Sequence, residues 1–414
     1  MLSLKNYGEN EAMIPYLLYI FMTLILSIVY DKREDCRAKR RWYRITCLFL
    51  ILLAGLRNGV GGDTLSYMEE YEDAWDSFGN IKEFISDSLI KHGRMPLWSM
   101  IFTTCRYFFE SFYIFQLLHA ILLNVTFFYV FKKFSKHIFL CALVYGLTGY
   151  FFLFNTEVLR ESVAIVCSIV AILYFVKHNY IGYVVFAILG ILFHASAAIM
   201  LIFPLMRFIP IHYLTLLACL LLSFAIWAIS DAIVSQLPSF IVMGDSSLAQ
   251  KVVHYSDIKS NIFGFLEYAL EYICFPYFIM YYSYTKMEDD PHREEKQQFI
   301  AFVLTIGVIS ASINGFARIR NYGAIFYIIA LADFIYLYVH QPKFLFLTRT
   351  MVLAGTIYFF SKFYLAYYTY SNRYHYEFYF PYTSIVDDDY SFQYRYEMHD
   401  ESTIINKDNN TRSN

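Results

Sequence analysis

The sequence alternates between long apolar stretches and short polar segments. A helix needs roughly 20 apolar residues to cross the hydrocarbon core of a membrane, and somewhat fewer when its polar ends reach the surface. Stretches of suitable length cover residues 14–30, 112–131, 138–154, 158–176, 181–208, 212–230, 262–284, 298–316, 321–340 and 344–368. A shorter stretch covers residues 45–57. The pattern predicts an all-α polytopic membrane protein.

Basic residues between the first two stretches predict the orientation. Residues 31–44 include seven Lys and Arg side chains, and short loops rich in Lys and Arg stay in the cytoplasm. The N-terminus is therefore expected outside the cell. Two later groups of basic residues are also expected inside, and they are Lys132, Lys133 and Lys136, and Lys286, Arg293 and Lys296.

Two segments decide how many spans this orientation requires. Residues 97–109 are short and include Arg106, so we expect an amphipathic or re-entrant helix at the outer surface. Residues 181–208 are long for one span, and we expect a break at His194 that gives two short half-spans meeting at an outer turn. With both choices every basic group falls inside, and the chain has about 12 transmembrane helices with both termini outside.

We expect one transmembrane domain over residues 1–368, with a large outer loop at 58–111. The first apolar stretch lacks the basic front and the cleavage site of a signal peptide, so it is expected to remain as a span. Residues 369–414 form a tail that is aromatic as far as Tyr396 and polar at its end. The tail is expected to be ordered near the membrane and disordered after about residue 400.

Composition excludes several other classes of protein. Apolar residues make up 58% of the chain and charged residues 16%, with 33 Lys and Arg against 35 Asp and Glu. Soluble domains are about 45–50% apolar and about 25% charged. These values exclude a disordered protein, a soluble multidomain enzyme and a basic nucleic-acid binder. The seven cysteines form no CxxC pair and show no spacing typical of a zinc site.

A glycine-rich turn follows the stretch at 45–57. Arg57 ends that stretch, and the segment Asn58-Gly59-Val60-Gly61-Gly62-Asp63-Thr64 comes next. Backbone N–H groups in such a turn, before a helix capped by Asp63 or Thr64 and beside an arginine, form an anion site. The alternative is an arginine that reaches the membrane surface and an ordinary helix cap.

Three more polar motifs are expected at the same outer face. Arg160 begins a predicted span after Asn155-Thr156-Glu157, where it serves a site or pairs with Glu157 and Glu161. His194 is either a general base or a hydrogen-bonded histidine at the interface. Arg318 and Arg320 begin another span, and their alternative role is to reach the membrane surface.

Acidic residues inside predicted spans are functional candidates by default. Glu267 and Glu271 are four positions apart, on one face of the helix predicted at 262–284, and Asp333 lies in the stretch at 321–340. Hydrogen bonds from the many tyrosines are the alternative explanation.

Several arginines beside a glycine turn suit a pyrophosphate, because Arg offers paired donors to phosphate oxygens. The aromatic surplus suits sugar stacking, although aromatic belts explain much of it.

Taken in order, these motifs resemble the EpsG family of Wzy-like polysaccharide polymerases. The resemblance covers most of the chain. It rests on Gly55-Leu56-Arg57, Gly59 and Gly62-Asp63-Thr64 with Tyr67 and Tyr71, Leu159-Arg160-Glu161 with Ala164, Phe193-His194-Ala195-Ser196, Arg320-Asn321-Tyr322, and Phe380-Pro381-Tyr382.

The resemblance implies a polymerase of exopolysaccharide, capsule or O-antigen repeat units in the plasma (inner) membrane, with its active site facing the outside or periplasm. Its substrates would be oligosaccharides linked to undecaprenyl diphosphate, and it would need no metal and no other cofactor. Beside the lipid bilayer, a chain-length regulator and a flippase are candidate partners, and nucleic acid is not.

A mechanism follows as a hypothesis. The diphosphate would be held by Arg57, Arg160, Arg320 and Arg318. His194, or else Asp63, would take the proton of the acceptor hydroxyl, with Glu271 and Glu267 as a proton relay.

Two other functions remain open at this point. They are a membrane O-acyltransferase of cell-envelope glycans, and a flippase or other transporter of lipid-linked sugars, although no internal repeat typical of transporters is found.

Overall fold

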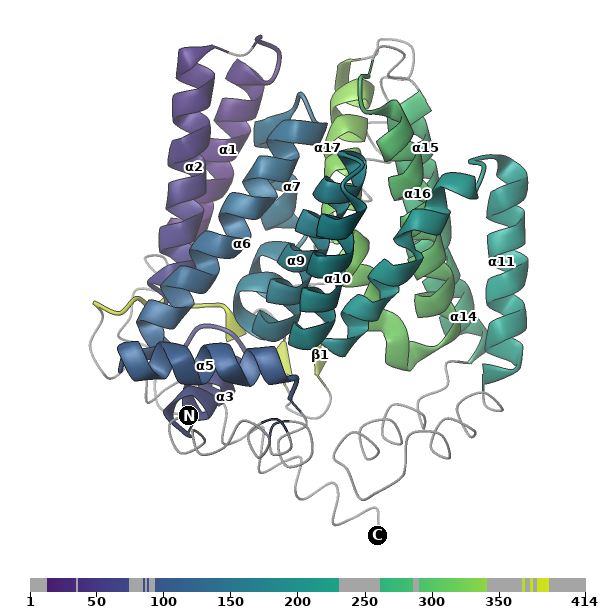
Figure 1. The fold of residues 1–414 in the computed structure, drawn as a ribbon. Helices are drawn as coiled ribbons and strands as arrows, with labels where there is room; N and C mark the ends of the chain where they lie inside the picture. Colours follow the sequence, from purple (N-terminus) through teal and green to yellow (C-terminus); the bar gives the residue numbers. More distant parts are fainter. Residues whose placement is uncertain are drawn as a thin grey trace. The chain divides into compact units, whose positions relative to one another are not determined.

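The computed structural model describes residues 13–34, 36–73, 85, 88, 94–230, 261–285, 290–340, 367–368, 373–374 and 378–386 (Figure 1). Its elements are helices apart from a short hairpin of β1 (Tyr367–Tyr368) and β2 (Arg373–Tyr374). Among the described residues, four helices are long and apolar enough to cross a membrane, or five if one bent pair counts as a span. Four shorter apolar helices of 10–17 residues accompany them. The protein is therefore a helical membrane protein.

Some predictions fall on residues that the structure does not describe. The span expected at 344–368 lies outside the described residues, except for Tyr367 and Tyr368, which belong to β1. Lys286 and the end of the tail also lie outside them. The chain divides into two compact units, which we describe separately.

The first unit comprises residues 1–76, 104–162 and 335–414. Its helical elements are α1 (Ile14–Tyr30), α2 (Arg37–Gly55), α3 (Thr64–Glu72), α6 (Phe112–Phe134), α7 (Ile138–Leu147), α8 (Tyr150–Phe152) and a π-helical turn, η4 (Leu153–Glu157). On α1, Phe21 and Ile25 are exposed, whereas Tyr19 and Thr23 are buried. Apolar side chains outside and hydroxyl groups inside suit a helix surrounded by lipid.

Helix α2 begins earlier than the predicted span at 45–57. It starts at Arg37, so most basic residues of the segment 31–44 lie on the first turns of the helix rather than in a loop. The Cys36 sulfur accepts the Lys39 N–H at this end, at 3.4 Å. The helix extends into the basic segment because Arg, Lys and Ala are strong helix formers.

Two groups of basic residues lie at the same end of the first unit. The Lys39 ammonium donates to the backbone carbonyl of Lys136 at 3.3 Å. The Asp31 carboxylate accepts the N–H groups of Phe139 and Leu140, at 3.2 and 2.9 Å, and so caps the start of α7. The segment between α1 and α2 therefore meets the segment between α6 and α7.

The stretch predicted as one span at 138–154 is not one straight helix. Helix α7 ends at Leu147, and the pieces from Tyr150 to Glu157 are bent from it by 83°. Gly149 between them has a φ of 77°, a left-handed conformation that glycine adopts without steric cost. The bent piece is either the second half of a broken span or a re-entrant segment.

The second unit comprises residues 77–103 and 163–334. Its elements are α10 (Tyr180–Phe193), the 3₁₀ helix η5 (Ala195–Phe208), α11 (Tyr213–Ala228), α14 (Ile262–Ala269), a π-helical turn η6 (Leu270–Cys274), α15 (Phe275–Thr285), α16 (Arg293–Ser312) and the 3₁₀ helix η7 (Asn314–Gly323). Three helices have residues in both units, and they are α5 (Pro96–Phe108), α9 (Leu159–Val176) and α17 (Ala324–His340).

The predicted break at His194 is confirmed. Helix α10 ends at Phe193, His194 is extended with φ −153° and ψ 124°, and η5 begins at Ala195. The Tyr183 hydroxyl donates to the Met200 carbonyl and joins the two pieces. With 14 residues each, α10 is about 21 Å long and η5 about 28 Å, because a 3₁₀ helix rises further per residue.

Helix α5 corresponds to the amphipathic segment expected at 97–109. Its 13 residues extend about 20 Å, which is less than the hydrocarbon thickness of about 30 Å. Trp98 and Phe102 are buried, whereas Tyr107 and Phe108 are exposed. The length and this division of its faces agree with a helix that does not cross the membrane.

Candidate functional site

The glycine-rich turn after α2 packs tightly against the end of η4. Gly59 and Gly61 have φ values of 63° and 112°. A Cβ atom at position 61 would lie 2.5 Å from the Cβ of Thr156. Glycine is therefore required at 61 both by the backbone conformation and by the available space.

Replacing Gly61 tests this packing. Gly61→Ala is expected to lower the free energy of unfolding by about 1–3 kcal/mol, because it adds backbone strain and a steric clash. Thermal unfolding in detergent measures the effect. Ser111→Ala, at an exposed position, is the control, and equal unfolding temperatures for both variants would show that the turn is not packed as described.

Several backbone donors of the turn are bonded within the protein. Gly62 N–H donates to the Glu157 carboxylate at 2.7 Å, and the N–H groups of Asn58 and Gly61 donate to backbone carbonyls at 2.8 and 2.9 Å. Asp63 occupies the N-cap position of α3, but its side chain makes no capping hydrogen bond. These three N–H groups therefore serve as a scaffold that fixes the turn.

Arg57 is held inside this scaffold. It is only 2% exposed, so it does not reach the membrane surface. Its Nε donates to the Val60 carbonyl at 3.2 Å and its Nη1 to the Ala54 carbonyl at 2.5 Å. Nη2 is buried and has no hydrogen-bond partner among the described residues. One amino group of the guanidinium therefore remains for another acceptor.

Arg160 lies in the same unit, at the second position of α9. Its guanidinium bonds to the Tyr67 hydroxyl, and its Nε is buried without a hydrogen-bond partner among the residues described. Glu157, one of its two predicted ion-pair partners, instead accepts the Gly62 N–H. Arg160 thus adds positive charge at a helix N-terminus, which itself favours anions.

The second unit contains a hydrogen-bonded chain of three side chains. His194 Nδ1 is 2.5 Å from Ser196 Oγ, and this oxygen is 2.9 Å from the hydroxyl of Tyr322. Ser196 and Tyr322 are 126 positions apart in the sequence. When Nδ1 donates to Ser196, Nε2 is the basic atom of the imidazole ring.

An arginine and a glutamate form another pair in the second unit. Arg320 Nη1 is 3.5 Å from Glu271 Oε1, and the guanidinium lies 4.7 Å from the ring centre of Tyr272. Glu271 lies on the π-helical turn η6, which begins after Glu267. Glu267 and Arg318 are exposed. The structure thus pairs one of the two predicted relay glutamates, Glu271, with an arginine.

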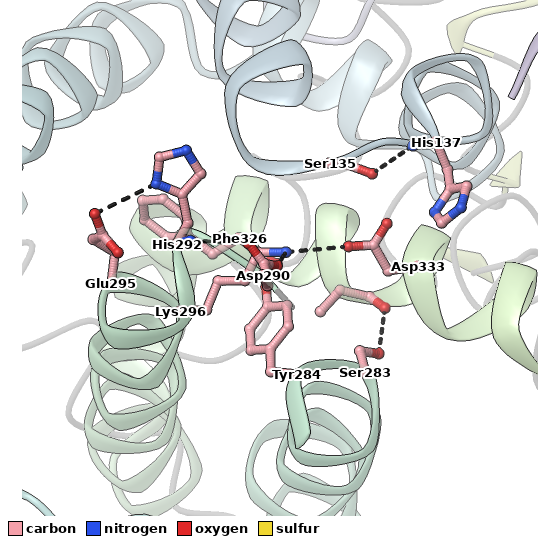
Figure 2. A network of polar contacts seen from close by, with 11 residues as sticks. Ser135, His137, Ser283, Tyr284, Asp290, His292, Glu295, Lys296, Phe326 and Asp333 are labelled. Carbon is pink, nitrogen blue, oxygen red and sulfur yellow. Dashed lines mark hydrogen bonds and ion pairs between the residues drawn. The ribbon is translucent and has the colours of Figure 1, made fainter. Parts of the chain in front are cut away.

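The buried Asp333 has a cation beside it (Figure 2). The Lys296 ammonium is 2.5 Å from Asp290 and 3.5 Å from Asp333, and it lies 4.9 Å from the ring centre of Tyr284. Lys296 is on the first turn of α16, and Asp290 precedes that helix. The carboxylate of Asp333 is thus part of an ion-pair cluster with Lys296 and Asp290.

Sequence reasoning missed several residues of these clusters. It treated Glu157 only as a partner of Arg160, and it gave Ser196 and Tyr322 no role beyond their motifs. It also did not assign a function to the segment at 378–386. For Ser196, Tyr322 and the segment at 378–386 the signal was a short family motif, which does not reveal which residue lies beside it in the fold.

The structure is that of a helical membrane protein in which polar motifs are paired within each compact unit. The model of the EpsG family matches residues 40–384, and the protein belongs to this family. The match confirms the resemblance noted in the sequence. Neither a curated protein nor a solved structure matches the chain.

Proposed function

We propose that this protein is a polysaccharide polymerase, a glycosyltransferase that joins oligosaccharide repeat units carried on undecaprenyl diphosphate. The observation that carries the proposal is the hydrogen-bonded chain of His194, Ser196 and Tyr322. It joins two motifs of the EpsG family into one group that can accept a proton. Membership of that family supports the general class, a polysaccharide polymerase-like membrane protein.

In this mechanism the acceptor hydroxyl attacks the anomeric carbon of the donor glycan. A new carbon–oxygen bond forms while the bond to the diphosphate breaks, and the diphosphate leaves with the bonding electrons. His194 Nε2 takes the proton of the hydroxyl. Ser196 accepts from Nδ1 and donates to Tyr322, and so holds the imidazole in the tautomer that can act as a base.

Arginines would stabilise the negative charge that grows on the leaving diphosphate. Arg160 is the strongest candidate, because it is partly exposed and lies at a helix N-terminus. Arg57 would add its Nη2 amino group, which has no hydrogen-bond partner among the described residues. Arg320 and Arg318 are the candidates in the second unit. There Glu271 would act as a proton relay, or would give up its ion pair with Arg320 when Arg320 binds the diphosphate. Asp63 remains the alternative base.

The proposal also includes the topology of about 12 spans with both termini and the active site outside. Within the first unit, the basic segments lie at the end of α2 opposite to the glycine turn. Within the second, Lys296 is on the first turn of α16, and η7, which contains Arg318, Arg320 and Tyr322, begins only after the other end of that helix. Both arrangements support an outer location for the candidate clusters, because basic loops stay in the cytoplasm.

Cysteine labelling tests this orientation. In a variant without native cysteines, Ser111→Cys is expected to react with a membrane-impermeant maleimide added to intact cells. Lys32→Cys, in the basic segment, is expected to react only after the membrane is opened. Both positions are exposed in the structure. The reverse labelling pattern would overturn the proposed orientation.

The activity itself is tested with purified protein in lipid discs and an undecaprenyl-diphosphate-linked repeat unit. A ladder of glycans with release of undecaprenyl diphosphate is expected. Movement of the substrate across the bilayer without a new glycosidic bond would instead identify a flippase. Transfer of an acyl group to the glycan without chain growth would identify an acyltransferase.

A further inference from the structure

Residues 378–386, which we call the C-terminal segment, pair with the glycine turn. Arg57 and Ser384 form an antiparallel bridge. The Asn58 N–H donates to the Thr383 carbonyl at 2.8 Å, and the Thr383 hydroxyl donates to the Asn58 carbonyl at 2.6 Å. These two residues are 325 positions apart in the sequence. Both backbone groups of Asn58 are thus bonded to the C-terminal segment.

The same segment also holds the other side of the turn. The Gly61 N–H donates to the Phe378 carbonyl at 2.9 Å. The Tyr379 side chain bonds to the Glu157 carboxylate, which is the group that accepts the Gly62 N–H. Tyr379 is fully buried. The C-terminal segment therefore contacts the turn directly and also through Glu157.

Helix α1 anchors the C-terminal segment in its place. The Tyr16 hydroxyl donates to the Tyr379 carbonyl at 3.1 Å. The Tyr16 ring also meets the rings of Phe380 and Tyr382 edge-on, with centroids 5.1 and 5.6 Å apart. Thr383 is 5% exposed, whereas Val386 is 86% exposed. The segment is therefore held beside the turn, and Val386 is exposed.

We propose that the C-terminal segment positions Arg57 for the diphosphate. The turn holds Nε of Arg57 through the Val60 carbonyl, and α2 holds Nη1 through the Ala54 carbonyl. The segment bonds the turn on both sides of Val60, at Asn58 and Gly61. Tyr379 and Thr383 are thus positioning residues that act through Arg57. The catalytic consequence rests on the proposed function, whereas the pairing itself does not.

Single hydrogen-bond deletions test the positioning role. Thr383→Val and Tyr379→Phe each remove one hydroxyl, and each is expected to lower kcat/KM for polymer formation about 3- to 10-fold. Thr383→Ser retains the hydroxyl and should restore the rate. Val386→Ala, at an exposed position of the same segment, should leave it unchanged. Full activity in Thr383→Val would overturn the proposal.

A double-variant cycle separates positioning from a general loss of structure. In an Arg57→Ala background, Thr383→Val is expected to have no further effect on kcat/KM, because the hydroxyl acts through Arg57. A merely structural role would instead lower kcat/KM by the same factor in both backgrounds. Equal factors in the two backgrounds would therefore contradict the proposal.

An engineered disulfide tests the pairing without relying on polymerase activity. The Ile385 N–H donates to the Leu56 carbonyl at 2.9 Å, and the two residues flank the bridge between Arg57 and Ser384, so their backbones are close enough to be tested with a disulfide. Leu56→Cys with Ile385→Cys, in a chain without native cysteines, should form the bond and keep its activity when oxidised. Failure of the folded protein to form it would overturn the pairing.

The outcomes of this experiment also distinguish the two proposals. Loss of activity on oxidation that is restored by reduction would show that the segment must leave the turn, and would contradict the positioning role. If the disulfide forms but even the unmodified protein makes no polymer, the proposed function fails while the pairing stands.

Discussion

His194→Ala is expected to lower the single-turnover rate of glycan transfer by about 10²–10⁴-fold, because it removes the general base. Binding of the lipid diphosphate should change little, since the imidazole takes its proton from the acceptor and not from the donor. Rapid-quench transfer assays with saturating donor measure the first quantity, and equilibrium binding of undecaprenyl diphosphate measures the second.

Matched variants separate the base from its surroundings. His194→Asn places an amide near the position of Nδ1 and can still donate to Ser196, but it cannot accept the proton, so it should be as slow as His194→Ala. Ser196→Ala and Tyr322→Phe should be slowed less, because they only weaken the hydrogen bonds that favour the reactive tautomer of His194. His178→Asn, at an exposed position of the same unit, is the control.

Two results would change this assignment. Transfer within a few-fold of the unmodified protein in His194→Ala would exclude His194 as the base and favour Asp63 or Glu271. Weaker donor binding with unchanged transfer at saturating donor would place His194 at the diphosphate instead.

Arg160→Ala is expected to lower the rate of transfer by about 10²–10³-fold, because it removes a donor aimed at the charge on the leaving group. Arg160→Lys should be nearly as slow, since an ammonium group lacks the planar pair of donors that matches phosphate oxygens. The rate of undecaprenyl diphosphate release, measured at equal protein levels, follows both variants.

The control for Arg160 is a similar exchange away from the candidate site. Arg44→Lys changes an exposed arginine of α2 and should leave the rate unchanged. Polymer of normal length made at the normal rate by Arg160→Ala would refute the role of Arg160. Recovery of most activity in Arg160→Lys would show that charge alone matters, without paired hydrogen bonds.

The break at His194 shows what the sequence can predict about the fold. The helix α1 has the same bounds as its predicted span, because one apolar stretch between polar ends permits only one placement. The break in residues 181–208 followed from the positions of basic residues elsewhere, since the orientation of each loop restricts the number of spans between them. Neither inference required any contact between helices.

The bend at Gly149 and the π-helical turns were beyond such reasoning. Residues 138–154 are apolar throughout, so hydropathy does not distinguish a straight span from one bent by 83°. Likewise, hydropathy does not reveal that the stretch at 262–284 contains the π-helical turn η6. These departures depend on packing against other helices, such as the close approach that Gly307 allows at the Tyr272 carbonyl.

By itself the sequence determined that this protein is a helical membrane protein of the EpsG family and which short motifs carry its polar chemistry. Hydropathy and motif order are local properties, so they can be read without a structure. Only the tertiary structure decided the partners of those motifs. Glu157 takes the Gly62 N–H, Tyr322 joins His194 through Ser196, and the C-terminal segment pairs with Asn58. Such pairings join residues up to 325 positions apart, and they form only when the chain buries polar groups that must then find partners.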